Sequence, residues 1–248
     1  MWSPERHAYI LQSLQRRQRL SIDECALSMG VSKETVRRDL IELEQQGQLL
    51  RVHGGAVLPA SAAEPPFEVR SRWRTEEKSA LTRAALARLE PGMCLLMDAG
   101  TTTLAMAHAL SQAPALFVVT NSIAAAAVIH QQPQHQLMLI GGPVSSHYPA
   151  TSGEQAMDAV RRIRADLAIR SPSACGPQLS PANYIAGEAM FAQALLQQSR
   201  QHLLLADSTK LRHDSRHQIC PPSQVQCLIT DSKASADELA RIRAQGVG

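Results

Sequence analysis

The spacing of apolar residues divides the chain into two parts with different periods. Up to about residue 47 the apolar positions recur three and four residues apart, which is the period of amphipathic helices. Beyond about residue 93 they gather in short continuous runs that alternate with helical segments, which is typical of a buried parallel sheet. The pattern therefore predicts a small helical domain followed by a larger α/β domain.

Three helices are predicted in the first part. The first spans residues 4–17. An S-x-x-E capping box that begins at Ser21 opens the second helix, and Gly30 ends it with a left-handed turn. Ser32 caps the third helix, which ends near Gly47. The apolar stripes of the first and third helices are formed by Ile10, Leu11, Leu14, Val36, Leu40 and Leu43.

The segment after the third helix has the features of a hairpin. Residues 49–58 place Gly54 and Gly55 between two short apolar stretches, which predicts a β-hairpin. Three helices and a hairpin make a winged helix-turn-helix domain over residues 1–58. Residues 59–66 (PASAAEPP) are rich in Pro and Ala, so we place a linker at 59–74 and a second domain at 75–248.

Six short apolar runs in the second part are predicted to be strands. Amphipathic helices separate them, so we expect a mostly parallel sheet that is covered on both faces, whose strand order does not follow from the sequence. The fold class is therefore α/β with a small N-terminal α+β domain. The runs are Met93–Met97, Leu116–Val119, Gln136–Ile140, Asp166–Ile169, His202–Ala206 and Cys227–Ile229.

Composition and charge narrow the function classes only slightly. Aromatic residues make up 3% of the chain, which argues against stacking platforms for single-stranded nucleic acid. The net charge is +3, and residues 1–60 hold eight basic and seven acidic side chains, so only the placement of charges can indicate a nucleic-acid partner. Five scattered cysteines argue against a disulfide framework or a metal site. Because the sequence has no signal-peptide or membrane-spanning run, we expect a cytoplasmic protein.

The third helix carries positive charge on its outer side. Lys33 and Arg37 stand four residues apart, and DNA phosphates would neutralise this like-charge pair. Arg38 is the best candidate for a bidentate contact with guanine. The alternative is a solvated face on which Glu34 pairs with Arg38. A capped helix, a glycine turn and a second capped helix form the helix-turn-helix arrangement, and this order of elements favours DNA binding.

The same residues form a longer motif. The segment VSKETVRRDLIELEQQGQLLRVHGGAV (residues 31–57) closely resembles the N-terminal domain of the DeoR family of bacterial transcriptional repressors. The signature is the Arg-Arg-Asp-Leu core at 37–40 together with the Arg-x-His-Gly-Gly-Ala wing at 51–56. The candidate DNA contacts are Ser32, Lys33, Glu34, Thr35, Arg37, Arg38, Arg51, His53, Gly54 and Gly55.

Small polar residues follow four of the predicted strands, at 98–103, 120–122, 141–142 and 207–210. In an open parallel sheet ligands bind beyond the carboxyl ends of the strands, and a glycine beside hydroxyls at a helix start offers donors to an anion. Each loop taken singly also fits a helix cap, and Lys210 alone also fits a solvated surface residue. Together the loops indicate an anion-binding crevice suited to a phosphate and a polyol, and not to a metal.

These loops resemble the effector-binding domain of the DeoR family, which is similar in fold to ribose-5-phosphate isomerase and CoA-transferase-like proteins. The resemblance implies a phosphorylated sugar as effector and no cofactor. Two features depart from the family pattern: residues 171–186 hold no carboxylate, and Leu211-Arg212 stands in place of the usual Phe-Gly. The candidate effector contacts are Asp98, Gly100, Thr101, Thr102, Thr103, Thr120, Asn121, Ser122, Gly141, Gly142, Glu188, Asp207 and Lys210.

Two classes of function compete. The leading hypothesis is a repressor of sugar or related carbon catabolism genes. It binds a double-stranded DNA operator as a homo-oligomer, a dimer or tetramer, and a phosphorylated sugar changes its affinity. The rival is a sugar-phosphate isomerase-like enzyme in which Lys210 or Glu188 acts as acid or base. The missing carboxylate near Gly176 counts against it, so we assign no catalytic residue and no metal. An activator, or a regulator without effector, also stays open, because the sign of regulation depends on operator position.

Overall fold

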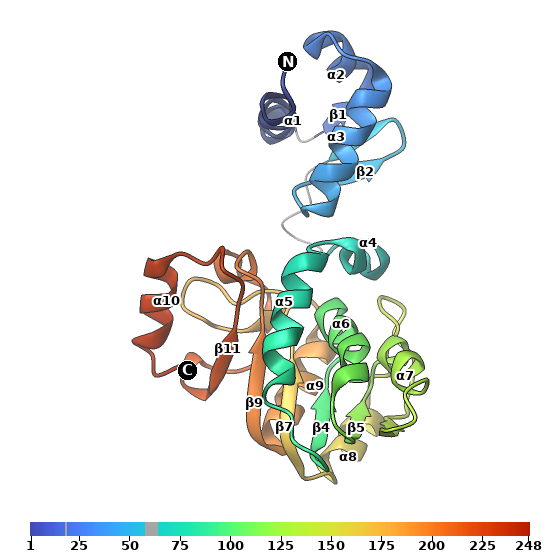
Figure 1. The fold of residues 1–248 in the computed structure, drawn as a ribbon, viewed down its shortest axis with the longest axis vertical. Coiled ribbons are helices and arrows are strands. Elements are labelled where there is room, and N and C mark those ends of the chain that lie inside the picture. Colours follow the sequence, from blue (N-terminus) through green and yellow to red (C-terminus); the bar gives the residue numbers. More distant parts are fainter. Residues whose placement is uncertain (18, 58–63) are drawn as a thin grey trace. The chain divides into compact units, whose positions relative to one another are not determined.

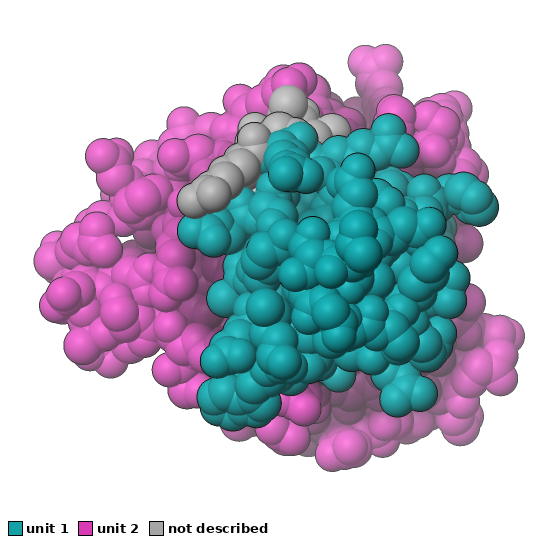
Figure 2. Space-filling model, turned by 90° about the horizontal axis from the view of Figure 1, so that it is seen from above, with its two compact units in different colours: residues 1–75 teal, residues 76–248 magenta. Residues whose placement is uncertain are grey.

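The computed structural model describes residues 1–17, 19–57 and 64–248, which fall into two compact units. Unit 1 comprises Met1–Thr75 and unit 2 comprises Glu76–Gly248 (Figure 2). Each unit has an apolar core of its own.

Unit 1 combines helices with a small antiparallel sheet whose strand order is β1-β3-β2 (Figure 1). Its described elements are α1 (Ser3–Arg17), β1 (Arg19–Ser21), α2 (Ile22–Met29), α3 (Lys33–Gln45), β2 (Leu50–Val52), β3 (Gly55–Val57) and α4 (Phe67–Arg72).

The three predicted helices of unit 1 are confirmed as α1, α2 and α3. Ile10 and Leu14 of α1 are fully buried in one cluster with the apolar stripe of α3. Gly30 ends α2 in the left-handed region, at φ 65° and ψ 35°, where glycine has no Cβ to clash. Ser32 caps α3 by accepting a hydrogen bond of 3.1 Å from the amide of Thr35.

The predicted capping box at Ser21 is wrong in its details. The Ser21 hydroxyl accepts from the amide of Asp23 at 3.2 Å, and not from the amide of Glu24. The Glu24 carboxylate lies instead 3.7 Å from the guanidinium of Arg17. An exposed cation therefore competes for the carboxylate that a capping box would fold back onto the helix start.

The wing contains a strand that the sequence pattern did not reveal. β1 pairs with β3, with Leu20 opposite Ala56, so the predicted hairpin of β2 and β3 is part of a three-stranded sheet. With three residues, β1 is too short to display an alternating pattern. A Cβ on Gly55 would lie 1.9 Å from the carbonyl oxygen of Leu20, so glycine permits this close pairing. Leu58, the predicted end of the hairpin, lies outside the described residues.

The segment 59–74, expected to be a linker, contains helix α4. Pro65 and Pro66 precede this helix, and prolines fit the start of a helix because the first amides need no partner. Beyond α4, the amide of Arg74 donates to the carbonyl of Gln45 at 3.1 Å. The Trp73 ring also lies against Gly47, since a Cβ there would be 3.1 Å from the ring. Residues 58–63 lie outside the described part.

Unit 2 contains a large parallel sheet and the helices that cover it. Its helices are α5 (Thr75–Leu86), α6 (Thr101–Ala109), α7 (Ile123–Ile129), α8 (Glu154–Arg161), α9 (Ala186–Gln197) and α10 (Ala236–Arg243), with short 3-10 turns at η1 (Leu110–Gln112), η2 (Lys210–Arg212) and η3 (Pro222–Gln224). Its strands are β4 (Cys94–Met97), β5 (Phe117–Thr120), β6 (Gln136–Leu139), β7 (Ala165–Arg170), β8 (Ala182–Asn183), β9 (Ser199–Leu205), β10 (His217–Gln218) and β11 (Cys227–Ile229). Over the described residues, no helix is both long and apolar enough to cross a membrane.

The main sheet has the strand order β11-β9-β7-β4-β5-β6, and every neighbouring pair is parallel. Each of the six predicted apolar runs coincides with one of these strands, which confirms the parallel α/β prediction. Numbered along the chain, the six strands follow the order 3-2-1-4-5-6 from one edge to the other. β8 and β10 form a separate antiparallel pair.

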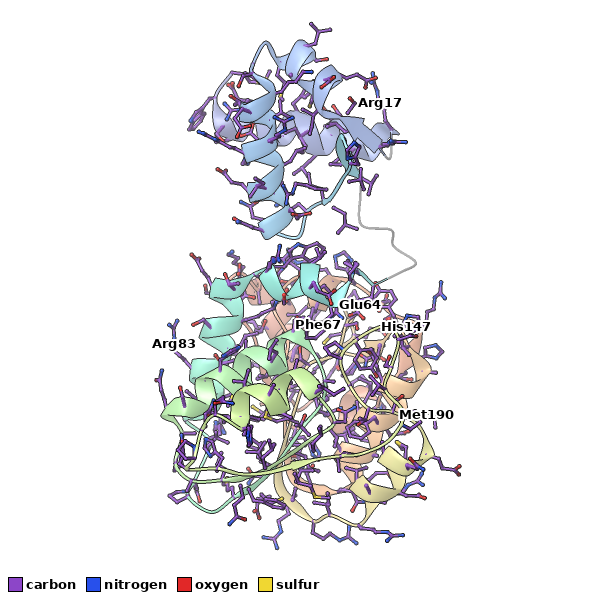
Figure 3. The ribbon with its side chains drawn as sticks, turned by 90° about the vertical axis from the view of Figure 1, so that its right-hand side faces the viewer. Arg17, Glu64, Phe67, Arg83, His147 and Met190 are labelled. Atoms are coloured by element: carbon purple, nitrogen blue, oxygen red, sulfur yellow. The ribbon has the colours of Figure 1, made fainter. Side chains whose placement is uncertain are left out.

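Helices cover both faces of the main sheet. Leu95 and Met97 of β4 pack in a cluster with α5, α6 and α7, whereas Leu96 packs in a cluster with α8 and α9. Figure 1 shows α5, α6 and α7 in front of the sheet. Arg83 of α5 and Met190 of α9, on opposite sides of unit 2 in Figure 3, mark the two outer layers. Because successive side chains of a strand point to opposite faces of the sheet, each strand contributes side chains to two apolar cores.

Candidate functional site

The outer side of α3 presents three exposed cations, Lys33, Arg37 and Arg38. The opposite side of the same helix is buried in the core of unit 1. Ser32 and Thr35 lie at the helix start, where their hydroxyls share a hydrogen bond of 2.9 Å. The predicted contact residues of α3 thus lie on the part of the helix that faces solvent.

Each of these cations has an acidic neighbour. Lys33 Nζ lies 3.0 Å from the carboxylate of Asp23, and Glu34 lies 3.4 Å from Arg37 and 3.9 Å from Arg38. The solvated pairing that the sequence offered as an alternative is therefore present. Exposed pairs of this kind contribute about 0–1 kcal/mol, so an incoming phosphate can replace the carboxylates at low cost.

The wing is fixed to α3 by an ion pair. Glu44 accepts from the backbone amide of Arg51 at 2.9 Å and from its guanidinium at 2.7 Å. The side chain of Arg51 therefore sets the position of β2 relative to α3. His53 and Gly54 are exposed at the tip, where Gly54 has φ +77°. Gly55 is buried by the strand pairing described above.

The most important residue that sequence reasoning missed in this unit is Asp39, inside the Arg-Arg-Asp-Leu core. Its carboxylate is buried and accepts from both Nε and Nη2 of Arg6, at 2.6 and 2.8 Å. The hydrogen bonds that Arg6 donates to Asp39 raise the pKa of Arg6. His7 lies 3.3 Å from the same carboxylate. Asp39 thereby links α3 to α1. The signal for this role in the sequence was an acidic residue directly after two outward-facing arginines.

In unit 2 the strand order reverses between β4 and β7. This place in the sheet is its topological switch point, here called the switch point. The chain leaves β4 toward one edge of the sheet and leaves β7 toward the other, and ligands of open parallel sheets bind where the order reverses. Asp98 follows β4 and Ser171 follows β7. The amide of Ser171 donates to Oδ2 of Asp98 at 3.0 Å, which joins the two strand ends.

Lys210 reaches the same place from the loop after β9. Its Nζ donates to the hydroxyl of Ser171 at 2.9 Å and to the carbonyl of Pro172 at 2.7 Å. An ammonium group has three donors, so these two bonds leave a third. Asp207 is buried at the start of this loop and accepts from the amide of Thr209 at 3.1 Å, which shapes the turn that carries Lys210.

The loop after β4 is partly closed on itself. The amide of Gly100 donates to the Thr103 hydroxyl at 2.8 Å, and that hydroxyl donates to the Gly100 carbonyl at 3.1 Å. Thr103 therefore follows the helix-cap alternative, because its hydroxyl bonds with both backbone groups of Gly100. Thr101 and Thr102 form the first turn of α6, whose amides have no partner within the helix.

The loop after β5 behaves in the same way. The amide of Ser122 donates to the Thr120 hydroxyl at 3.0 Å, and the Ser122 hydroxyl caps α7 by accepting from Ala125 at 3.1 Å. Asn121 donates to the carbonyl of Thr151 at 2.8 Å, while its buried Oδ1 has no hydrogen-bond partner within the described segments. Thr120 and Ser122 thus follow the helix-cap alternative, and Asn121 keeps an unused acceptor.

The structure separates two other predicted contacts, Gly141 and Gly142, from this group. Gly141 and Gly142 follow the edge strand β6, so β5 lies between them and the switch point. A Cβ on Gly142 would lie 2.7 Å from the carbonyl oxygen of Ser152, which gives this glycine a structural role. Glu188 is partly exposed in the first turn of α9.

The electrostatics of the switch point centre on Asp98. Burial raises the pKa of this carboxyl, and the amide of Ser171 and the charges of Arg170 and Lys210 partly offset the increase. Arg170, the last residue of β7, is a fully buried arginine that sequence reasoning missed. Its signal was a charged residue at the end of the apolar run DLAIR. No group of three or more His, Cys, Asp or Glu suited to a metal occurs in the described ranges.

One argument made from the sequence is corrected by the structure. Residues 171–186 hold no carboxylate, yet Asp214 brings one to this segment from elsewhere in the chain. A Cβ on Gly176 would lie 2.0 Å from Oδ1 of Asp214, and the amide of Gly176 donates to the carbonyl of His213 at 2.8 Å. Because these two segments pack together only in the folded chain, the missing carboxylate cannot count against an enzyme.

These features define a two-unit protein that joins a winged helix-turn-helix to an α/β unit with a donor-rich switch point. The DeoR-like helix-turn-helix domain matches residues 6–62, and the DeoR C-terminal sensor domain matches residues 73–232. The chain belongs to the DeoR family, which confirms the resemblance found in the sequence.

Several curated relatives match along nearly their whole length. The chain is 32% identical to the HTH-type transcriptional repressor CsqR of Escherichia coli (strain K12), over 96% of this chain and 91% of that protein. It is 31% identical to the glycerol-3-phosphate regulon repressor of the same strain, over 94% and 92%. It is also 29% identical to the HTH-type transcriptional repressor GlcR of Bacillus subtilis (strain 168), over 93% and 89%.

Solved structures are similar at the level of the fold. eIF2B beta from Chaetomium thermophilum aligns with a TM-score of 0.50 at 13% identity, over 73% of this chain and 56% of that chain. A ribose-5-phosphate isomerase in complex with phospho-erythronic acid aligns with a TM-score of 0.42 at 15% identity, over 55% and 53%.

Replacing Asp39 by Asn should destabilise unit 1, because the Arg6 guanidinium loses its carboxylate partner. Both tryptophans of the chain, Trp2 and Trp73, belong to unit 1, so tryptophan fluorescence during urea unfolding reports on this unit. Glu42→Gln is the matched control: it removes an exposed carboxylate of the same helix and should change stability by less than about 0.5 kcal/mol. Equal midpoints for the two variants would contradict the role given to Asp39.

Proposed function

We propose that this protein is a DNA-binding transcriptional repressor of genes for sugar or related carbon catabolism, and that a phosphorylated sugar bound in unit 2 controls its affinity for the operator. One observation carries this proposal: the same DeoR-family chain contains both an exposed basic helix and a switch point rich in hydrogen-bond donors. Its relatives named as repressors, among them a glycerol-3-phosphate regulon repressor, support the choice of regulation and of ligand class.

In this proposal α3 enters the major groove. Lys33 and Arg37 exchange their carboxylate partners for DNA phosphates, and Arg38, the most exposed of the three at 76%, contacts a base edge. Ser32 and Thr35 lie at the helix start within reach of the backbone. His53 and Gly54 approach the DNA from the wing, whereas Arg51 acts through its ion pair with Glu44.

The effector binds at the switch point between β4 and β7. The amides of Thr101 and Thr102 at the start of α6, with the remaining donor of Lys210, bind the phosphate. The carboxylate of Asp98 accepts hydrogen bonds from the hydroxyls of the sugar. A ligand that binds one conformation of the protein more tightly than the other shifts the equilibrium between them, and operator affinity follows.

A single helix-turn-helix has limited affinity, so we propose that a symmetric homo-oligomer, a dimer or tetramer, reads paired half-sites. A regulator of this kind acts where the chromosome is, in the bacterial cytoplasm. The sign of regulation follows the relatives named as repressors.

The competing function is catalysis on a sugar phosphate, for which Asp214 beside Gly176 would now supply a carboxylate. Asp214 is exposed to solvent, unlike a proton-abstracting base sheltered from water. Relatives that match over more than nine tenths of this chain are named as repressors, so we favour a protein that binds the sugar phosphate without converting it.

Replacing Arg37 and Arg38 together by alanine should weaken operator binding at least tenfold at moderate salt, because two groups that face the DNA are lost. The measurement is a gel-shift titration at several salt concentrations, in which the salt dependence should also become shallower. Arg161→Ala with Arg162→Ala removes the same charge from an exposed site in unit 2 and should bind like the wild type. Equal affinities of the two double variants would refute the assignment of α3.

A matching phosphorylated sugar should stabilise unit 2. At one hundred times its dissociation constant, such a ligand adds about 2.7 kcal/mol, which a thermal-shift panel of glycerol 3-phosphate, ribose 5-phosphate and glucose 6-phosphate detects readily. Lys210→Met should lower the affinity at least tenfold. Arg83→Met removes a positive charge from the exposed outer side of α5 and should leave the affinity unchanged. A wild-type protein that no phosphorylated sugar stabilises would refute sensing at this site.

A further inference from the structure

Arg170 and Asp98 stand side by side at the switch point. Met97 of β4 pairs in register with Ile169 of β7, so the next residues along the two strands, Asp98 and Arg170, are neighbours as well. Two positions earlier, Leu96 and Ala168 face the same core, so alternation directs Asp98 and Arg170 to that face also. Arg170 is 1% exposed and Asp98 is 6% exposed.

Both side chains have hydrogen-bonding capacity that the protein does not use. Throughout the described part of the chain, neither Nε nor Nη1 of Arg170 has a hydrogen-bond partner, and the same holds for Oδ1 of Asp98. Buried polar groups are almost always satisfied, and a buried charge without compensation costs several kcal/mol. The guanidinium of Arg170 and the carboxyl of Asp98 are therefore buried neighbours, each with polar atoms that have no hydrogen-bond partner among the described residues.

Asp98 is an acidic neighbour of Arg170, and two further neighbours are thiols. The guanidinium hydrogen-bonds with the thiol of Cys220 and lies near Cys175. Burial raises the pKa of Cys175 to about 12 and also raises that of Cys220, so both thiols stay protonated at neutral pH. An arginine that served only to hold these segments together would direct its N–H groups at carbonyls or carboxylates, as Arg6 does toward Asp39.

We propose that Arg170 and Asp98 form an effector-reading pair, in which the guanidinium binds an anionic oxygen of the ligand and Asp98 Oδ1 accepts a hydrogen bond from one of its hydroxyls. This inference rests on the proposed sensing function and adds the residue that selects phosphorylated over neutral sugars. Cys175, Leu179 and Cys220 belong to the cluster that surrounds Leu204, the register partner of Arg170. The segments that carry them must open to admit the ligand, and this movement links binding to a change of shape.

Arg170→Met tests the pair. The variant keeps the side-chain volume but leaves the buried carboxyl of Asp98 without its neighbouring charge, so it should melt below the wild-type temperature, and binding is compared where both proteins are folded. The phosphorylated sugar that stabilises the wild type in the panel above should bind at least tenfold more weakly to it. Arg164→Met, which removes an exposed arginine just before β7, should bind normally. Arg170→Lys, which keeps the charge but loses the planar donor set, should lose at least fivefold.

The outcomes separate the two proposals. A wild-type protein without any thermal shift overturns sensing, and this inference with it. A wild-type shift that Arg170→Met and Arg170→Lys share within twofold overturns the role of Arg170 and leaves sensing intact. If Arg170→Met does not fold, Arg170→Lys alone decides between these results.

A second, independent observation concerns the other half of the sheet. Residues 99–153 contain no Asp, Glu, Lys or Arg, and they include α6, β5, α7 and β6. Three large apolar side chains of this stretch are exposed: Met138 at 38%, Leu139 at 43% and Val144 at 64%. Contiguous apolar surface without charge marks interaction sites on soluble proteins.

The two edge strands of the main sheet, β11 and β6, differ in how their outward backbone groups are covered. At the β11 edge the chain covers itself: the amide of Leu228 donates to the carbonyl of Gly248 at 3.0 Å. At the β6 edge, the amides of Gln136 and Ile140 point inward, to the carbonyls of Leu116 and Thr120. In a parallel ladder, residues 137 and 139 then direct their backbone groups outward. β6 also lacks the charges that normally protect an exposed edge.

We propose that the β6 edge of unit 2, formed by a segment (99–153) without Asp, Glu, Lys or Arg, binds a second copy of the same chain. A two-fold axis brings the same surface patch of both copies together, so a patch built from uncharged residues meets its copy without repulsion between like charges. An edge strand is likewise complementary to a copy of itself running antiparallel. The resulting dimer would supply the two helix-turn-helix units that paired half-sites need.

Size-exclusion chromatography with light scattering tests this surface. The wild type should be a dimer or a larger even oligomer, and Leu139→Lys should be at least tenfold more dissociated at equal concentration. Met190→Lys adds the same charge to a still more exposed apolar position on α9 and should keep the wild-type state. A monomeric wild type, or a Leu139→Lys variant that assembles like Met190→Lys, would overturn the proposal.

Discussion

In a parallel sheet every strand ends at the same edge, and the ligand site of unit 2 depends on this constraint. Strand order then decides which loops meet at that edge. β4 and β7 are neighbours in the sheet although helices α6, α7 and α8 and strands β5 and β6 lie between them in the chain, and Asp98 and Ser171 are therefore joined by a hydrogen bond of 3.0 Å. Lys210 closes the group from the next strand, and Arg170 is buried directly behind it. Without that order the same residues would be scattered polar positions.

In the DNA-binding unit, the outward-facing and the inward-facing charges have different roles. Its outward cations are paired with carboxylates of the same unit, so the surface of α3 is close to neutral before DNA arrives. In the proposed complex, DNA binding exchanges these weak exposed pairs for contacts with phosphates, which gains less Coulomb energy than bare cations would but avoids repulsion among the cations of the free protein. The inward-facing Asp39 has a structural role. Its ion pair with Arg6 is shielded from solvent and fixes α3, the helix that carries the outward cations.

Much of this fold could be predicted from one sequence because local signals were strong. Gly30 and Ser32 bound the two helices of the helix-turn-helix as expected, and each apolar run became a strand of the main sheet. The misses have local causes as well. β1 is too short to show a period, and the Ser21 capping box failed because Arg17 attracts Glu24.

The sequence by itself determined the longer helices and the strands of the main sheet, the family and the loops that carry small polar residues, since periodicity, caps and motifs act over a few neighbouring positions. Only the tertiary structure decided which of those loops share a site. It turned Thr103 and Ser122 into helix caps, set Gly142 apart at an edge strand, and placed Asp214 beside Gly176 across a long stretch of chain. It also buried Arg170 next to Asp98, because strand register and burial are properties of the packed sheet that no single segment contains.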